Sequence, residues 1–221
     1  INNQNRDDSL SFICLCKYSS IDELKLYITD HELSDGQLDL NQQDATGNTG
    51  LLMACHHNTQ HPDVIPYLIE ELKFDVTFKN YRKDTCLILA SKLAPLNIIK
   101  LLVTEILKSG NNALIHAVNY YNENALFNAC KFNTLDVVKY LFEELDMNIS
   151  EPQSNVFLMA CSHNKNSDVI KYIVNNFQVN IQTDNYYGAN GLMGAIRSNT
   201  LDVVKFLIDE CMGMILSWLI P

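Results

Sequence analysis

The sequence has little of what secreted, membrane-spanning or nucleic-acid-binding proteins require. Its 221 residues carry 16 Lys and Arg against 26 Asp and Glu, a net charge of −10, whereas binding along a phosphate backbone needs clustered cations. The longest apolar run, residues 212–220, is shorter than the roughly 20 residues that cross a bilayer. The opening INNQNRDDSL lacks the apolar core of a signal peptide. We therefore predict no nucleic-acid partner and no membrane association.

Motifs that carry catalysis or hold cofactors and metals are also missing. The sequence contains no CxxC pair, no GxxxxGK[ST] loop, no GxGxxG turn and no HExxH pattern. His57 and His61 are four residues apart, but no further Cys or His follows at the spacing of a zinc site. Cys55 and His56 are adjacent on a predicted helix and point apart, so they do not form a nucleophile and its base. We predict no catalytic residues, no cofactor and no metal.

What the sequence does contain is an internal repeat. Six apolar segments follow one pattern: DELKLYI (22–28), DVIPYLI (63–69), NIIKLLV (97–103), DVVKYLF (136–142), DVIKYIV (168–174) and DVVKFLI (202–208). A second segment precedes each of them: SLSFICLC (9–16), NTGLLMAC (48–55), DTCLILAS (84–91), ENALFNAC (123–130), SNVFLMAC (154–161) and ANGLMGAI (189–196). Because the apolar residues recur at helical spacing, each repeat is predicted to be two short helices.

Small and polar residues recur at fixed places in these repeats. Five of the six first segments place Ala at one position, where a small side chain lets neighbouring helices approach closely; the first repeat has Leu15 there. We expect the Asn between the helices to adopt the left-handed conformation of a tight turn and so to replace Gly. Ser20, Thr134 and Thr200 are predicted N-caps of second helices. The alanines are Ala54, Ala90, Ala129, Ala160 and Ala195, and the asparagines are Asn58, Asn133, Asn164 and Asn199.

This pattern resembles the ankyrin repeat, which has a period of 33 residues and a Thr-Pro-Leu-His-x-Ala first helix. Thr49 and Thr85 match the family Thr, the five alanines match its Ala, and the DVVKYL-like segments match its second helix. The Asn-rich, Gly-poor repeats are similar to those of amoebal and giant-virus ankyrin arrays. Apolar residues replace the family His, namely Leu52, Ile88, Phe127, Leu158 and Met193.

The resemblance implies an all-α ankyrin-repeat solenoid of about six helix–turn–helix units with β-turn fingers. We place one array over residues 1–221, with repeats at 9–43, 44–79, 80–118, 119–149, 150–182 and 183–210 and an apolar cap or tail at 211–221. The tail either covers the last repeat, begins another element or inserts into lipid. The long junctions 29–48 and 107–123 are either recognition elements or tolerated surface loops.

A solenoid offers an extended surface rather than a deep pocket, so the resemblance implies a protein-binding module. Tyrosines gather at the predicted finger tips, where they supply contact area for a partner or brace the neighbouring finger. The tip residues that we predict to bind are Tyr81, Arg82, Tyr120, Tyr121, Tyr186 and Tyr187.

Residues two and three positions after each Ala are expected to face the concave groove. This row is neutral to basic on an acidic protein, which favours an acidic peptide or helix as the partner; the alternative is a solvated helix face. The groove residues that we predict to bind are His56, Lys92, Lys131, Phe132 and Arg197, in a row that also includes His57, Leu93, Ser162, His163 and Ser198.

Cysteine recurs at one register position, directly after the Ala or Leu15. A repeated position indicates a packing slot, where a free thiol behaves as a small buried hydrophobe. Reduced thiols favour the cytoplasm, or the host cytosol if the protein is an effector. The residues at this position are Cys16, Cys55, Cys130 and Cys161.

Two functions follow from these observations. The first is a monomeric, non-enzymatic adaptor that binds an unidentified protein through finger tips and groove. The second is a substrate-targeting domain of a larger enzyme or secreted effector, whose catalytic part lies outside these residues. The chain begins with Ile rather than Met, so we expect it to be a segment of a longer protein.

Overall fold

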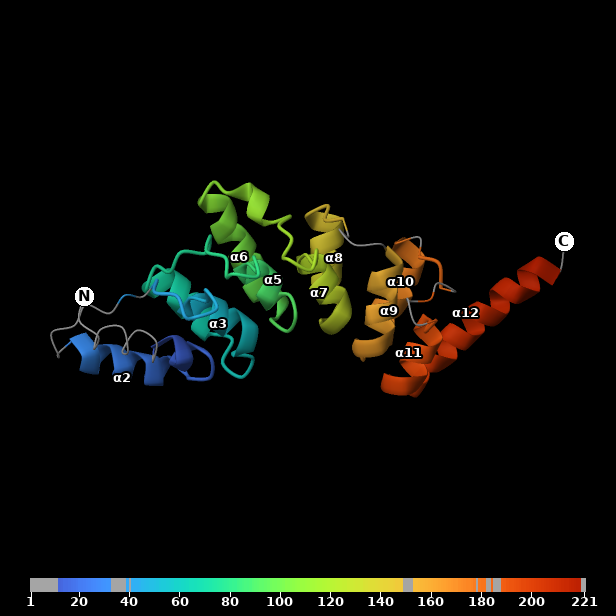
Figure 1. The fold of residues 1–221 in the computed structure, drawn as a ribbon, viewed down its shortest axis with the longest axis horizontal. Coiled ribbons are helices and arrows are strands. Elements are labelled where there is room, and N and C mark those ends of the chain that lie inside the picture. Colours follow the sequence, from blue (N-terminus) through green and yellow to red (C-terminus); the bar gives the residue numbers. More distant parts are fainter. Residues whose placement is uncertain are drawn as a thin grey trace. The chain divides into compact units, whose positions relative to one another are not determined.

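The computed structural model describes residues 12–32, 39, 41–148, 153–177, 179–181, 184 and 188–219. In these ranges the regular structure consists of helices and two isolated antiparallel bridges, Lys79–Thr85 and Asp184–Asn190 (Figure 1). The chain forms two compact units, residues 1–125 and 126–221, and each is considered by itself.

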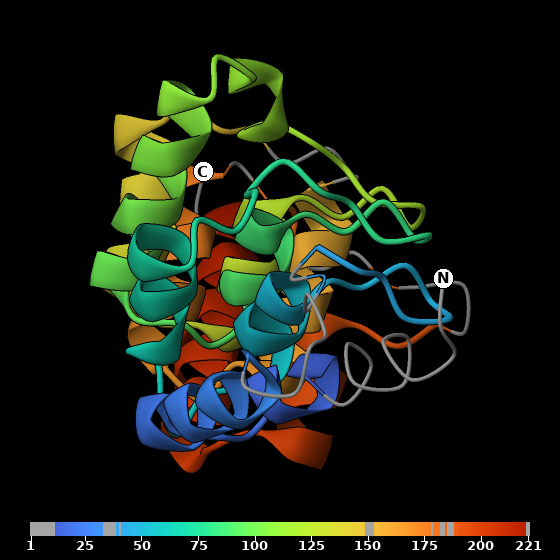
Figure 2. The ribbon, with the colours of Figure 1, turned by 90° about the vertical axis from the view of Figure 1, so that its left-hand side faces the viewer.

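In the unit of residues 1–125, the first helices of successive repeats stack on one another, and so do the second helices. A helical turn at residues 12–16 precedes α2 (Ile21–Glu32), α3 (Gly50–His57), α4 (Val64–Pro66) with a π-helical turn (Tyr67–Glu71), α5 (Cys86–Ala90), α6 (Leu96–Lys108) and a 3-10 turn (Asn112–Leu114). The first helices α3 and α5 pack together, as do the second helices α4 and α6. Figure 2 shows the second helices, the first helices and the loops of this unit in that order from left to right.

The unit of residues 126–221 repeats this arrangement. Its helices are α7 (Ala125–Phe132), α8 (Leu135–Lys139) with a π-helical turn (Tyr140–Glu144), α9 (Gln153–His163), α10 (Ser167–Asn176), α11 (Gly191–Ser198) and α12 (Leu201–Leu219). The first helices α9 and α11 pack together, and the second helices stack in the order α8, α10, α12. The segment that we predicted as a separate tail continues α12 through residue 219; its side chains lie outside the described part of the structure.

Helix starts follow the repeated Thr and Asn. Thr49 Oγ1 accepts from Leu52 N at 3.4 Å and Thr85 Oγ1 accepts from Ile88 N at 3.2 Å, so both threonines cap first helices. Ser20 caps α2 in a reciprocal pair with Glu23, whose Oε2 accepts from Ser20 N at 2.8 Å. Thr134 occupies the predicted N-cap position of α8, but its hydroxyl donates to the carboxylate of Asp136 and does not cap the helix backbone.

The repeated small and apolar positions form the core. The Ala positions of α3, α5, α7, α9 and α11 are 0–1% exposed, and the cysteines that follow them are also buried. The residues in place of the family His are buried up to the last repeat, so the core is apolar there as expected. In the long junction after α6, Leu114 and Ile115 are buried, which anchors this insertion to the core.

The repeated Asn does not take the left-handed conformation that we predicted. The non-glycine residues with positive φ are Lys73, Lys83, Asn122 and Asp146 in the described chain, so Asn58 and Asn164 are not among them. Their side-chain amides instead donate across to the preceding repeat. Asn58 Nδ2 lies 3.2 Å from Cys16 O and 2.9 Å from Ser19 O. The position therefore needs an amide donor more than backbone freedom.

Candidate functional site

Basic and aromatic side chains gather at the C-terminal ends of the first helices in residues 12–125. His56 and His57 end α3, and their ring centroids lie 4.0 Å apart. Lys92 Nζ, just after α5, lies 3.4 Å from His56 Nε2. The Tyr18 ring lies 6.4 Å from that of His57, and Lys17 Nζ lies 4.8 Å from the Tyr18 centroid. We call these five residues the inner-helix surface.

The two histidines of this surface are held in the neutral form at pH 7. Burial lowers the pKa of His56 to about 4, together with the charges of Lys92 and Lys17 and the neighbouring His57 ring, against an opposing effect of Asp84. Burial and the same two lysines also lower the pKa of His57. The surface thus combines two ammonium groups with neutral imidazoles on a protein of net charge −10. Its charge is complementary to carboxylates.

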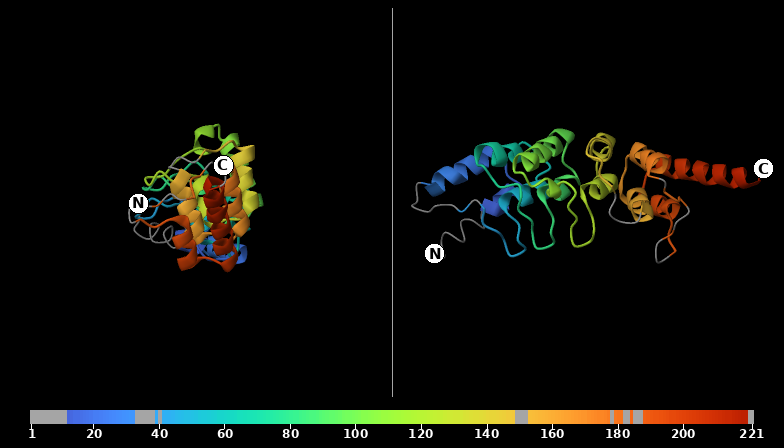
Figure 3. Two further views of the ribbon diagram at one scale, coloured as in Figure 1. Left: turned by 90° about the vertical axis from the view of Figure 1, so that its right-hand side faces the viewer. Right: turned by 90° about the horizontal axis from the view of Figure 1, so that it is seen from above.

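Three fingers in this unit lie side by side and bond through their main chains; they span residues 41–49, 76–85 and 115–124. Tyr81 N donates to Thr46 O at 3.0 Å, and Tyr120 N donates to Arg82 O at 2.9 Å. They project together on one side of the helices in the right-hand view of Figure 3. The side chains of Tyr81, Tyr120 and Tyr121 are 62–66% exposed.

Two tip rings also brace their neighbours. A Cβ built on Gly47 would lie 2.6 Å from Tyr81 Cδ1, so this ring lies against bare backbone at a residue with φ of +81°. The ring of Tyr120 lies 4.8 Å from Nζ of Lys83, which takes the place of Gly47 in the next finger. Bracing and binding are therefore compatible for these residues, because one face of each ring packs while most of its surface is open.

A polar ladder joins the bases of the fingers. Asn80 Nδ2 donates to Asn48 Oδ1 at 3.0 Å and to Asp84 Oδ2 at 3.1 Å. Asn119 Nδ2 donates to Asp84 Oδ1 at 2.9 Å and to Glu123 Oε2 at 3.3 Å. Each bond links one finger to itself or to the next. The tips are therefore held in fixed relative positions before any partner arrives, which lowers the entropy cost of binding.

The second unit places its predicted groove residues in the same way. Lys131 and Phe132 end α7, with Lys131 Nζ 4.9 Å from the Phe132 centroid. The Phe132 ring meets His163 at the end of α9 edge-on, with centroids 5.6 Å apart. Arg197 lies exposed near the end of α11. The predicted finger-tip residues Tyr186 and Tyr187 lie outside the described residues.

Sequence reasoning missed Lys17 and Tyr18. They follow Leu15 by two and three positions, the same spacing that separates His56 and His57 from Ala54. This spacing could have identified both residues from the sequence. The first repeat has Leu15 where the others have Ala, however, so the row of groove residues was counted only from the second repeat onward.

The cysteines fill packing slots. Cys16, Cys55, Cys86, Cys130 and Cys161 are buried, and burial raises the pKa of the Cys161 thiol to about 12. Thiols in this state are poor nucleophiles and poor metal ligands. Within the described ranges, no group of three or more His, Cys, Asp or Glu is placed to hold a metal ion. No helix described by the structure is long and apolar enough to cross a membrane.

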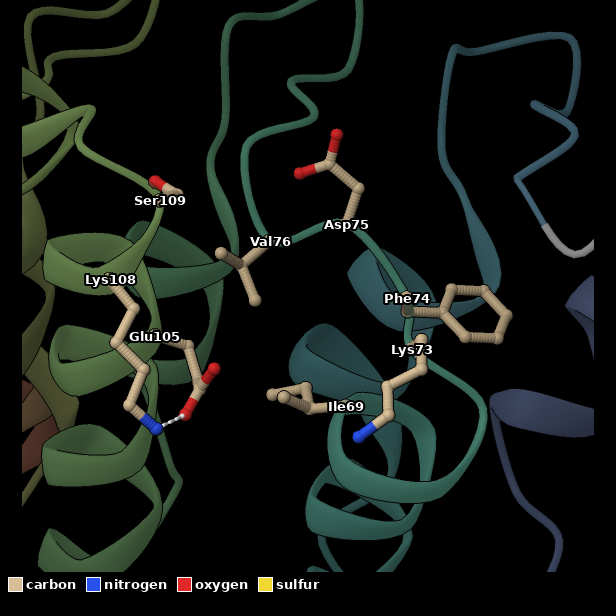
Figure 4. Close-up of a pocket in the computed structure, with 8 residues that line it drawn as sticks. All are labelled: Ile69, Lys73, Phe74, Asp75, Val76, Glu105, Lys108 and Ser109. Atoms are coloured by element: carbon tan, nitrogen blue, oxygen red, sulfur yellow. Dashed lines mark hydrogen bonds and ion pairs between the residues drawn. The ribbon is translucent and has the colours of Figure 1, made fainter.

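A hollow of about 270 Å³ opens between the C-terminal parts of the α4 segment and α6 (Figure 4). Ile69 and Val76 point into it, while Lys108 Nζ at its rim is paired with Glu105 Oε1 at 2.6 Å. The hollow is smaller than ordinary ligand pockets, and it lies on the second-helix side of the repeats. We therefore place the candidate site at the inner-helix surface and the finger tips.

Comparison with protein families matches this chain to ankyrin repeats, in three overlapping copies over residues 12–112, 97–182 and 126–215. The chain belongs to the ankyrin-repeat family. The predicted fold class is thereby confirmed, and ankyrin repeats are modules of protein–protein interaction. No curated protein matches the chain.

The ankyrin fold of this chain is also found among solved structures. One similar chain belongs to the solved complex of the predatory endopeptidase Bd0816 from Bdellovibrio bacteriovorus with the immunity protein Bd3460. The match has a TM-score of 0.54 and 17% identity, and it covers 83% of this chain and 91% of that chain. At that identity the likeness concerns the ankyrin fold alone.

Proposed function

We propose that this ankyrin array is a non-enzymatic protein-binding module that takes an acidic segment of its partner on the inner-helix surface and the adjoining finger tips. The observation that carries the proposal is the pairing of Lys92 with a neutral His56, continued by His57, Tyr18 and Lys17, on a strongly acidic protein. Lys17 and Lys92 bring two cations to one surface of an acidic protein, which favours an anionic ligand.

The chemistry of recognition follows from these groups. Carboxylates of the partner accept hydrogen bonds from Lys17 and Lys92, and such charge-assisted bonds are stronger than neutral ones. A carboxylate beside His56 also offsets the effect of the lysines and so raises the pKa of that imidazole. The exposed rings of Tyr81, Tyr120 and Tyr121 add apolar contact area on the prearranged fingers.

The test uses a labelled glutamate-rich helical peptide and the 221-residue chain, with binding followed by fluorescence anisotropy at low and high salt. Lys17→Glu and Lys92→Glu are compared with Lys100→Glu, which changes an exposed lysine on the second helix α6. We expect binding to weaken with salt, to be lost in the first two variants and to persist in the third. Equal loss in all three variants, or equal binding of a lysine-rich peptide, contradicts the proposal.

The same surface serves an adaptor and a substrate-targeting domain of a larger enzyme or effector alike, and both remain proposals. We place the module in a reducing compartment such as the cytoplasm, and the buried free thiols support this.

A further inference from the structure

Cys86 stands apart from the other buried cysteines of the described chain. The others occupy the repeated slot directly after the Ala or Leu15, whereas Cys86 is the first residue of α5, four positions before Ala90. The glycines among the residues at this place show what a side chain there would touch. In the other repeats the residues are Gly50, Ala125, Val156 and Gly191.

The start of a first helix faces the cysteine slot of the repeat before it. A Cβ built on Gly50 would lie 2.9 Å from the Sγ of Cys16, and a Cβ built on Gly191 would lie 3.2 Å from the Sγ of Cys161. The two pairs belong to different units of the chain, so the same register holds in both units. The residue that begins α5 is therefore expected to face the cysteine slot of α3.

At this interface both facing residues are cysteines. Cys55 and Cys86 are 6% and 0% exposed, and their helices α3 and α5 pack together. The pKa of the Cys55 thiol is raised, first by a hydrogen bond with the Cys86 side chain and then by burial. In a disulfide, the Sγ of one cysteine lies roughly 3 Å from the Cβ of the other. The distances at Gly50 and Gly191 match this value, so the register suits a disulfide.

We propose that Cys55 and Cys86 form a redox-dependent cross-link between the second and third repeats. A chain that folds in contact with a small-molecule disulfide, such as oxidised glutathione, closes a Cys55–Cys86 disulfide, and a chain that folds in a reducing medium keeps two thiols. The thiolate of one cysteine attacks the small disulfide and releases one small thiolate, and the second cysteine attacks the mixed disulfide and releases the other. The protein loses two electrons and two protons, and the small disulfide becomes two thiols.

Burial preserves the state of the pair once the chain has folded. Exchange requires a thiolate and a disulfide that can reach each other. Because both sulfurs lie inside the stack of α3 and α5, exchange takes place while the chain is unfolded or still folding. The folded array therefore retains the redox state of the medium in which it folded. In the reducing compartment proposed above, the pair stays as two thiols.

The register confines the cross-link to this interface among the buried cysteines of the described chain. Cys16 and Cys161 face glycines, and the residue expected to face Cys130 is Val156, so these three cysteines meet no thiol at this place. A cysteine introduced at Val156 should consequently create a second pair, in the unit of residues 126–221.

The experiment refolds the urea-unfolded chain into buffers with increasing proportions of oxidised glutathione. Cys14→Ser and Cys211→Ser remove the exposed thiol and that of the C-terminal helix from every chain. After the free thiols have been alkylated, mass spectrometry of the peptides locates each disulfide. We expect one disulfide, Cys55–Cys86. Its equilibrium constant of formation should be at least about 30-fold larger than in urea, because a disulfide and the fold that accommodates it stabilise each other equally.

Two variants test the assignment, with circular dichroism as the check on helix content. Cys86→Ala should form no disulfide, and Val156→Cys should gain a second disulfide, to Cys130. Glutathione attached to Cys55 or Cys86 in place of the internal disulfide overturns the proposal, and so do equal equilibrium constants with and without urea. A folded Val156→Cys chain that lacks the second disulfide overturns the register on which the proposal rests.

Discussion

Asn199 donates its side-chain amide to the main-chain oxygen of Asn164, 2.8 Å away, and Asn164 makes the same bond to Asn133 at 2.9 Å. The two asparagines occupy the same place in successive repeats. Each also donates to a second carbonyl, that of Cys161 or Cys130, at 2.7 and 3.0 Å. One side chain per repeat therefore satisfies two carbonyls that end the preceding first helix.

Replacing Asn164 by Ala should lower the free energy of unfolding by about 2 kcal/mol or more, because two buried carbonyls lose their donor. The matched control is Asn176→Ala. Asn176 also donates to a carbonyl, that of Tyr172 at 2.9 Å, but it is exposed, so water replaces the bond at a cost of about 0.5 kcal/mol or less. Urea denaturation measures both. Similar costs for the two variants would show that the inter-repeat bonds add little.

Gly47→Ala should destabilise the protein more than Gly110→Ala. Both glycines have positive φ, +81° and +76°, so both variants incur a backbone cost of about 1 kcal/mol. The new Cβ at position 47 meets the ring of Tyr81 at 2.6 Å and the backbone N of Tyr81 at 2.9 Å, whereas position 110 is open within 4 Å. Only the ring part of this clash is removed by Tyr81→Ser. Thermal unfolding in the presence and absence of Tyr81→Ser measures the steric part. If removing the ring does not reduce the excess cost, the clash at position 47 is with the backbone of Tyr81 and not with its ring.

Acidification should destabilise the wild type through His56. Its pKa of about 4 in the folded state lies below the value of roughly 6.5 in an unfolded chain, so the unfolded state takes up the proton first as the pH falls. The stability that the fold has with His56 neutral is fully present above pH 6.5, and it is lost progressively as the pH falls towards 4. Urea midpoints over this window should fall less steeply for His56→Gln than for the wild type.

Lys92→Gln tests the cause of that shift. Removing the ammonium 3.4 Å from the imidazole should raise the pKa of His56, which an NMR titration of the ring reports directly. An unchanged titration would assign the shift to burial and to the neighbours other than Lys92.

Native thiol reactivity should be confined to few sites. Cys14 is exposed and reacts at once with a thiol reagent such as DTNB, while Cys16, Cys55, Cys130 and Cys161 react only after unfolding, because they are buried and their pKa values are raised. The assay is made in a Cys211→Ser background, which removes the cysteine of the C-terminal helix. Rapid labelling of Cys130 without urea would argue against tight packing between repeats.

The fold could be predicted from the sequence because burial leaves a periodic trace. Ala54 and Ala160 recur where helices approach, and Cys55 and Cys161 recur beside them. The role of Asn164 could not be predicted in this way, since its partners lie in another repeat and only the stacking brings them within reach. The local property of Asn, its tolerance of positive φ, pointed to the wrong cause.

The candidate site was predictable in position and only partly in membership. Counting from Ala54 and Ala90 located His56 and Lys92, and the structure brings these two into contact. The low pKa of His56 depends on distances between side chains from three repeats, which no single stretch of sequence encodes. The exposure of Ile196 likewise depends on what lies beside it, because the same position is buried in the repeat before.

The asparagine link has a consequence for how such an array changes length. Asn164 donates through its side chain to the repeat before it and accepts through its main chain from the repeat after it. Each of these repeats thus carries an Asn amide donor towards the repeat before it and a carbonyl acceptor towards the repeat after it. If a unit is duplicated, the new Asn amide finds an acceptor carbonyl in the repeat before it, and its own main-chain carbonyl finds a donor in the repeat after it. If a unit is deleted, the Asn of the next repeat meets an equivalent carbonyl in the repeat that now precedes it. Recombination within the gene can therefore lengthen or shorten this series of asparagine-linked repeats without a compensating substitution.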